Sequence, residues 1–439
     1  MNKARLDGLY VMLIGNAVFL LLGVGLATTS PVEMVDFRGL YFPTQCLLQH
    51  CNPYNEDEVL RFTAAAQGGR PQDVVQAREV MRYIYPPTTF VFTAPFAMLP
   101  WGVAHFLWMT LIAGSLIFSS FLIWSLGADY APVASGILIG FLLANSEMLM
   151  VTGNVAGIAI SFCLISVWCF LRNRFVWAGI LCLAISLIVK PHDAALVWLF
   201  FLLAGGVHRK RAWQTLLVTL ALSLPVVLWV WHVSPNWMQG LHTNIAECSA
   251  PGGPMDPGIT SSGAHGLGMV VSLQTVFAVF WDDPRFYNPA SYLVCAPLLL
   301  LWAFVTLRFR SSYTREWLAL AAIAPLTLLP IYHRQQDTKL LLLTIPACAM
   351  LWAAGGLVGK LALFVNAVGF FCTTEFPWVV LLAFLNHVHW PAAWWVRDLV
   401  IAVQIFPIPL ILLATCIFYL WVYASRIRAN PRSSLQPTH

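Results

Sequence analysis

Long apolar runs recur along almost the whole chain and determine its fold class. Each run holds roughly 20 mainly apolar residues, the length a helix needs to cross a hydrocarbon core of about 30 Å. A transmembrane β-barrel would instead show segments of about 10 residues that alternate between apolar and polar positions. No such alternation is present. The pattern therefore predicts an all-α polytopic membrane protein with about twelve transmembrane helices.

The predicted spans are residues 8–28, 101–126, 131–148, 153–171, 175–189, 191–207, 213–233, 289–307, 316–332, 338–356, 361–385 and 396–423. A shorter apolar piece at 88–99, between two prolines, cannot cross a bilayer and predicts an interfacial or re-entrant helix. We expect one integral membrane domain over residues 1–439. Its two long polar segments would be a first outer loop at 29–100, with interfacial helices, and a second at 234–288.

Lysines and arginines in the short connections predict the orientation, because such residues favour the cytoplasmic side. The basic residues that fall on one side are Lys3, Arg5, Arg172, Arg174, Arg209, Lys210, Arg211, Arg308, Arg310, Arg315, Lys360, Arg426 and Arg428. Both termini are then cytoplasmic, and both long loops face outward.

Composition supports the membrane assignment. The 439 residues are 59% hydrophobic and 10% charged, whereas an average soluble domain carries about 25% charged residues. The net charge of +5 follows from basic residues at helix ends, so we expect membrane lipids and no nucleic acid as partners. The ten cysteines form no CxxC pair and no Cys/His ligand spacing, which predicts no zinc-type site. A disulfide could join Cys46 to Cys51, or either of them to Cys248, in an oxidising compartment.

Polar residues at membrane depth gather at the predicted outer ends of the spans, and such residues suggest a functional site. They are Asp36, Glu147, Asn154, Lys190, His192, Asp193, His333, Arg334, Asp337 and Lys339. Two stretches are dense in them: the "KPHD" turn at 190–193 and "IYHRQQDTK" at 331–339. Their lysine, arginine and histidine side chains suit a lipid phosphate. Solvated turns with headgroup contacts remain the alternative for both stretches, and a helix cap remains the alternative for Asp36.

Several motifs, taken in order, resemble glycosyltransferase family 87, whose members are polytopic enzymes of the C-type glycosyltransferase fold. The first outer loop is similar in "VDFRGLYFPTQCLLQHCNPYN" at 35–55. Later landmarks are "YPPTTFVFTAPFAMLP", "TGNVAG", "GILCLAISLIVKPHDA" and "YHRQQDTKLLLL". Two features depart from the family pattern. Pro43 is expected to interrupt a helix, and Asn154 follows Gly153 directly, without the glutamine of the family's turn.

The resemblance implies an inverting transferase that uses a polyprenyl-phosphate sugar. Asp36 would be the general base that deprotonates an acceptor hydroxyl. Cations would stabilise the leaving phosphate: Lys190, His192, His333 and Arg334. Candidate sugar or acceptor contacts are Tyr41, Tyr54, Tyr85, Glu147, Asn154 and Asp337. The resemblance implies no metal ligands and no cofactor besides the donor.

The expected reaction moves mannose, another hexose or arabinofuranose to a glycolipid or envelope glycan hydroxyl. It would take place at the outer face of a bacterial cytoplasmic membrane. Two alternatives stay open from the sequence: a multispan transporter or lipid flippase, and a ligase that uses polyprenyl diphosphate. A transporter would be expected to show inverted repeats with broken helices, and the sequence shows no internal repeat.

Overall fold

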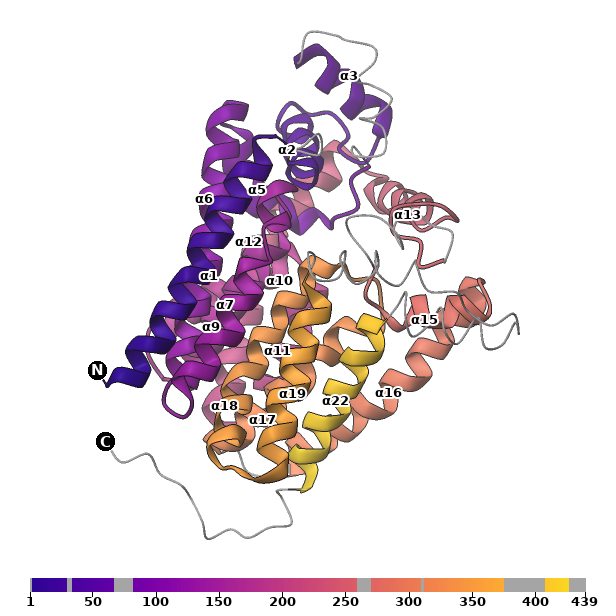
Figure 1. Ribbon diagram of the computed structural model, residues 1–439. Coiled ribbons are helices and arrows are strands. Elements are labelled where there is room, and N and C mark those ends of the chain that lie inside the picture. Colours follow the sequence, from indigo (N-terminus) through magenta and orange to yellow (C-terminus); the bar gives the residue numbers. More distant parts are fainter. Residues whose placement is uncertain are drawn as a thin grey trace, which may run out of the picture.

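The computed structural model describes residues 2–29, 34–66, 82–258, 270–308, 312–374 and 407–425. Within these ranges the regular elements are helices, and the extended pairing is one isolated bridge between Val270 and Arg334. The helices form a bundle with smaller helices at one end (Figure 1).

The elements of the N-terminal half are α1 (Lys3–Ala27), α2 (Val35–Leu48), α3 (Glu56–Ala66), the 3₁₀ turn η1 (Pro87–Thr89), α5 (Phe90–Ala97), α6 (Trp101–Gly127), α7 (Pro132–Ala144), α8 (Met148–Val151), α9 (Ala156–Leu171) and α10 (Val176–Val189). The remaining elements are α11 (Pro191–Ala204), α12 (Gly206–Val233), α13 (Trp237–Cys248), α15 (Leu273–Phe280), α16 (Pro284–Arg308), α17 (Tyr313–Leu328), the 3₁₀ segment η2 (Gln335–Thr344), α18 (Ile345–Ala353), α19 (Gly356–Thr373) and α22 (Pro407–Ser425).

Each predicted span overlaps at least one helix among the described residues, but not every such helix can cross a bilayer by itself. Among the described residues, seven segments are long and apolar enough: α1, α6, α7 with α8, α12, α16, α19 and α22. The apolar helices α9, α10 and α11 have only 16, 14 and 14 residues. The expected span at 338–356 begins as the 3₁₀ segment η2. The prediction of twelve full-length spans is therefore not confirmed.

Burial explains why the shorter helices looked like spans. Almost every side chain of α9 is buried, and so is every residue of α17 from Trp317 to Leu328. A helix that is packed on all sides by protein is apolar all round, as a lipid-facing helix is. Hydropathy does not separate these two cases. The parts of the last two predicted spans at 375–385 and 396–406 lie outside the described residues.

Small residues let α1 and α7 pack with their backbones in close contact. A Cβ atom added to Gly136 would lie 2.1 Å from the Gly8 carbonyl oxygen, and one added to Gly15 would lie 2.2 Å from that of Gly140. Gly136 and Gly140 form the GxxxG spacing that membrane helices use for close approach. This contact holds the N-terminal helix against the bundle.

Ion pairs and a hydrogen bond bring basic residues of three segments together at one end of the bundle. Asp129, between α6 and α7, pairs through its Oδ1 with Arg5 at 2.5 Å and through its Oδ2 with Arg172 at 2.6 Å. Arg211 on α12 donates to the Phe170 carbonyl at 2.6 Å. We call this end the Arg5 end.

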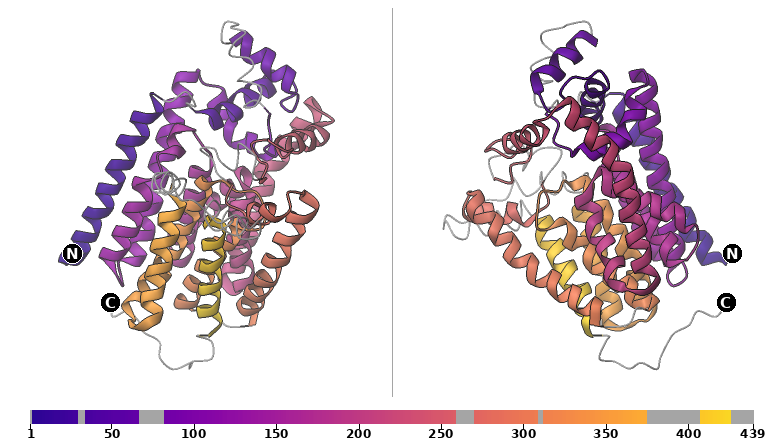
Figure 2. Two further views of the ribbon diagram at one scale, coloured as in Figure 1. Left: turned by 45° about the vertical axis from the view of Figure 1, so that its right-hand side comes forward. Right: turned by 180° about the vertical axis from the view of Figure 1, so that it is seen from behind.

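The opposite end, which we call the α2 end, carries α2, α3 and α13 (Figures 1 and 2). These helices come from the two long segments that the sequence predicts as outer loops. Arg82 joins the two segments, because its Nε lies 3.0 Å from an oxygen of Glu56 and 3.1 Å from one of Glu247. Asn244 on α13 also donates to the carbonyl oxygens of Tyr54 and Tyr83. The two long segments thus pack against each other at the α2 end of the bundle.

Two sequence-based expectations for α2 have clear outcomes. The helix continues through Pro43 to Leu48, so the proline does not interrupt it. Cys46 and Cys51 form a disulfide, which confirms one of the pairings that the sequence allows. Cys248 is buried and is a free thiol.

We expect Gly136→Val to destabilise the protein, because its side chain would overlap the Gly8 backbone. Overpacking of this kind costs about 1–3 kcal/mol. The measurement is the Tm of the detergent-solubilised protein. The matched control is Gly114→Val on α6, where an added Cβ meets nothing within 4 Å. Equal Tm values for the two variants would contradict the close contact between α1 and α7.

We expect the denatured, unreduced protein to have eight titratable thiols out of ten cysteines. Cys51→Ser should raise this count by one, because it releases Cys46, and Cys248→Ser should lower it by one. Thiol titration and peptide mass mapping measure these counts. A rise on Cys248→Ser would instead show that Cys248 belongs to the pair.

Candidate active site

The first turn of α2 docks on the turn between α8 and α9. The Asp36 amide donates to the Thr152 carbonyl at 2.8 Å, and the Met34 amide donates to the Val151 carbonyl at 2.7 Å. Gly153 has φ +65°, and a Cβ there would lie 2.9 Å from a Met34 side-chain atom. Glycine is therefore required here for both conformation and space. The turn fixes where α2 begins, and so fixes the position of Asp36.

Aromatic rings pack around the turn between α8 and α9 and around the first turn of α2. The Trp108 indole donates to the Gly153 carbonyl at 2.9 Å. Phe37, next to Asp36, stacks on Trp108 at 4.3 Å and on Trp101 at 5.5 Å between ring centroids. The backbone around Asp36 is consequently held by packing as well as by hydrogen bonds.

Asn154 holds one oxygen of the Asp36 carboxylate. Its Nδ2 donates to Asp36 Oδ2 at 2.8 Å, while its Oδ1 accepts from the Ala156 amide at 2.8 Å. The second contact determines the orientation of the amide group, because only the oxygen can accept from a backbone N–H. Asp36 Oδ1 lies 3.9 Å from Arg334 Nη1, and the Asp36 side chain is 18% exposed. One oxygen is thus restrained, and the other faces a cation in a partly open position.

A second group of charges lies where α10 meets α11. Lys190 is the last residue before Pro191, and its side chain is largely buried. Its ammonium pairs with Asp337 Oδ1, and it lies 3.4 Å from Asp193 Oδ2. Asp337 Oδ2 accepts from the Arg334 amide at 2.9 Å and so caps η2. Two carboxylates therefore share the Lys190 ammonium.

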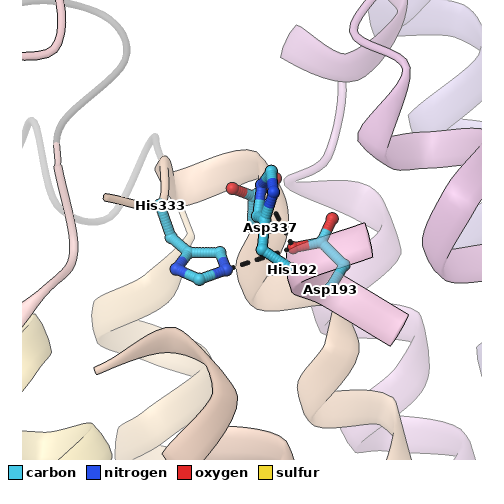
Figure 3. A group of neighbouring side chains, drawn as sticks. All are labelled: His192, Asp193, His333 and Asp337. Carbon is cyan, nitrogen blue, oxygen red and sulfur yellow. Dashed lines mark ion pairs between the residues drawn. The ribbon is translucent and has the colours of Figure 1, made fainter. Parts of the chain in front are cut away.

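Two histidines complete this second group (Figure 3). His333 Nε2 lies 3.3 Å from Asp193 Oδ1, and His192 Nε2 lies 3.9 Å from the same oxygen. The two imidazole rings meet edge to face at 4.9 Å. His333 is fully buried, whereas about a third of the His192 side chain is exposed. We refer to Lys190, His192, Asp193, His333 and Asp337 as the His–Asp cluster.

Arg334 and Tyr85 connect the His–Asp cluster to Asp36. Arg334 pairs its amide with Asp337, directs its guanidinium to Asp36 and donates from Nε to the Tyr332 hydroxyl. Burial raises the pKa of the Tyr85 phenol; Asp36 raises it further, and Lys190 and Arg334 oppose this. The Tyr85 phenol therefore interacts electrostatically both with Asp36 and with Lys190 of the His–Asp cluster.

The structure does not bring all the predicted site residues together. Tyr41 is buried, and its hydroxyl donates to the Leu99 carbonyl at 2.6 Å. Tyr54 packs against Tyr83 and donates to the Tyr85 carbonyl at 3.1 Å. Glu147 is buried beside α8, and its Oε2 has no hydrogen-bond partner among the described residues. Tyr41 and Tyr54 thus support α2 and Tyr85 from within the core.

Sequence reasoning listed Asp193 only among the polar residues at membrane depth, whereas the structure places it at the centre of the His–Asp cluster. The available signal was its position in "KPHD", three residues after Lys190 in the first turn of α11. The search for metal ligands relied on spacing along the chain. His192 and Asp193 lie about 140 residues from His333 and Asp337, so spacing along the chain could not reveal that they meet. In the structure, one ligand atom from each of the four lies within 4.8 Å of the others.

The arrangement can accept a proton and hold an anion at neighbouring positions. Asp36 offers a restrained carboxylate. The Arg334 guanidinium beside it can donate strong hydrogen bonds to an anion. This combination suits displacement of a phosphate by a hydroxyl group.

Comparison with protein families matches residues 83–330 to glycosyltransferase family 87, which is more than half of the chain. The matched region includes Asn154, Lys190, His192 and Asp193, while Asp36 lies before it and His333 and Arg334 lie after it. No curated protein and no solved structure gave a match. The resemblance seen in the sequence motifs is confirmed: this membrane protein belongs to glycosyltransferase family 87.

Proposed function

We propose that this glycosyltransferase is an inverting enzyme that takes a sugar from a polyprenyl-phosphate donor and adds it to a hydroxyl of a glycolipid or envelope glycan. The acceptor oxygen attacks the anomeric carbon as the bond from that carbon to the phosphate oxygen breaks. The hydroxyl proton moves to Asp36, and the phosphate leaves with the bonding electron pair. Attack from the face opposite the phosphate inverts the anomeric configuration.

The observation that carries this proposal is the Asp36 carboxylate. Asn154 anchors Oδ2, which leaves Oδ1 to accept a proton from a bound hydroxyl. A general base must lie within hydrogen-bond reach of the proton it removes, and the partial exposure of Asp36 allows a substrate to come that close. The fixed start of α2 holds the carboxylate in position for this transfer.

Arg334 is the side chain best placed to stabilise the leaving phosphate. Its guanidinium lies beside Asp36 and is about one quarter exposed, and arginine matches phosphate oxygens in a bidentate manner. Lys190 contributes less directly, since Asp193 and Asp337 already share its charge. His192 is partly exposed and supplies a further donor toward the phosphate.

Tyr85 suits contact with a sugar hydroxyl. Its phenol stays neutral because burial raises its pKa, so it can donate a hydrogen bond. The membrane environment suits a polyprenyl chain, and family membership favours sugar transfer over the transporter and flippase alternatives. We place the reaction at the α2 end, facing away from the cytoplasm of a bacterial inner membrane.

Asp36→Asn should lower the rate of sugar transfer by roughly 10²–10⁴-fold, the usual contribution of a general base. The assay follows transfer from a panel of radiolabelled polyprenyl-phosphate sugars to native lipid extract. The matched control is Asp57→Asn on α3, an exposed acid of the same outer segment, which should transfer at the wild-type rate. Full activity of Asp36→Asn would exclude Asp36 as the base.

Asn154→Asp should lower kcat by roughly 10- to 100-fold with little change in KM, because a hydrogen bond to a charged group contributes about 1.5–3 kcal/mol. Aspartate still accepts from the Ala156 amide, so the turn is preserved, but the donor to Asp36 is replaced by a second carboxyl group that disturbs its charge. The measurement is steady-state kinetics together with Tm. A variant with wild-type kcat would mean that Asn154 only shapes the turn.

A further inference from the structure

The hydrogen bonding of His333 determines which of its ring nitrogens carries a proton. Nδ1 lies 3.1 Å from the Ile331 carbonyl oxygen. A carbonyl oxygen only accepts, so Nδ1 must be the protonated nitrogen. In the neutral ring, Nε2 then presents a lone pair to Asp193 Oδ1 at 3.3 Å. Two acceptors would then face each other in a fully buried position, unless a proton or a metal ion lies between them.

This arrangement around His333 is characteristic of a metal-binding histidine. Such residues commonly donate their other ring N–H to a backbone carbonyl or carboxylate, which sets the tautomer and the ring orientation. Neither Asp193 oxygen has a hydrogen-bond partner among the described residues, nor does His333 Nε2, although all three atoms are buried. Lys190 lies 3.4 Å from Asp193 Oδ2, so the two atoms without a nearby cation in the described part of the chain are Asp193 Oδ1 and His333 Nε2, which face each other at 3.3 Å (Figure 3).

The distance between His333 and Asp193 matches that between two ligands of a metal ion. One ligand atom each from His192, Asp193, His333 and Asp337 lies within 4.8 Å of the others. Tetrahedral zinc with bonds of about 2.0–2.1 Å separates its ligand atoms by roughly 3.4 Å, and the contact between His333 and Asp193 already has this length. His192 needs a small shift, and its partial exposure provides a route for an ion.

We propose that His192, Asp193, His333 and Asp337 bind a divalent transition metal ion of the zinc class, which two imidazoles and two carboxylates suit. Asp337 would share its carboxylate between the ion and Lys190. The proposal departs from the sequence-based expectation of no metal.

A role for this ion in catalysis rests on the proposed function. With neutral imidazoles, Lys190, Asp193 and Asp337 together carry one net negative charge, which disfavours a phosphate nearby. A divalent ion changes this sum to one net positive charge. The loaded cluster would therefore attract the phosphate of the donor beside Arg334.

Metal binding is tested on the full-length, detergent-purified protein with its affinity tag removed and with no sugar donor present. After chelation, equilibrium dialysis against Zn²⁺ and elemental analysis should give about one ion per chain. Co²⁺ should give the visible absorption of a four-coordinate site. His333→Gln and His192→Gln should each weaken binding by at least 10- to 100-fold, the range seen even for outer-shell partners. His242→Gln, an exposed histidine on α13, is the matched control and should bind as wild type does.

Asp36→Asn separates this proposal from the proposed function, since it should lose sugar transfer and keep full metal binding. A folded wild-type protein that binds no stoichiometric Zn²⁺ or Co²⁺ would overturn the metal site. Equal binding by His333→Gln and His242→Gln would overturn it as well.

Discussion

The docking of α2 on the turn at 151–155 is the contact on which the candidate site depends. Two backbone hydrogen bonds fix the first turn of α2, and Asn154 extends the same contact to the Asp36 side chain. The turn can make this contact because Gly153 adopts a positive φ and leaves room for Met34. The Trp108 indole also donates a hydrogen bond to the Gly153 carbonyl and so holds the turn. Without this docking, Asp36 would be an ordinary acid at the start of a helix.

The candidate site joins segments that serve different purposes. The turn at 151–155 and α2 position a carboxylate, whereas the "KPHD" turn and the start of η2 concentrate charge. Arg334 belongs to both parts, because its backbone caps η2 with Asp337 and its side chain reaches Asp36. A change in the packing of η2 would therefore alter the anion site and the base together.

The membrane class, the helices and the main polar residues of the site could be predicted from sequence, because each is a local property. Asp36, Asn154, Lys190 and Arg334 stood out as polar groups in an apolar chain. Their contacts could not be predicted, since 118 residues separate Asp36 from Asn154. Spacing also could not show that His192 and Asp193 meet His333. Tyr41 and Tyr54 were expected as ligand contacts because they are aromatic residues of the first long polar segment, and the sequence alone does not show that both are buried. The twelve full-length spans are not confirmed, and hydropathy alone does not separate burial in protein from burial in lipid.

The short length of α10 sets the depth of the site. This helix has 14 residues and leads from the connection that carries Arg172 to Lys190. At 1.5 Å per residue it rises only about 21 Å, whereas the hydrocarbon core is about 30 Å thick. If the Arg5 end lies at one membrane surface, as we propose, the His–Asp cluster would lie several ångströms below the headgroups of the other surface. A lipid-borne phosphate can reach this depth by sinking slightly along the protein while its hydrocarbon chain stays in the bilayer. A water-soluble sugar nucleotide would have to leave water to reach the same point.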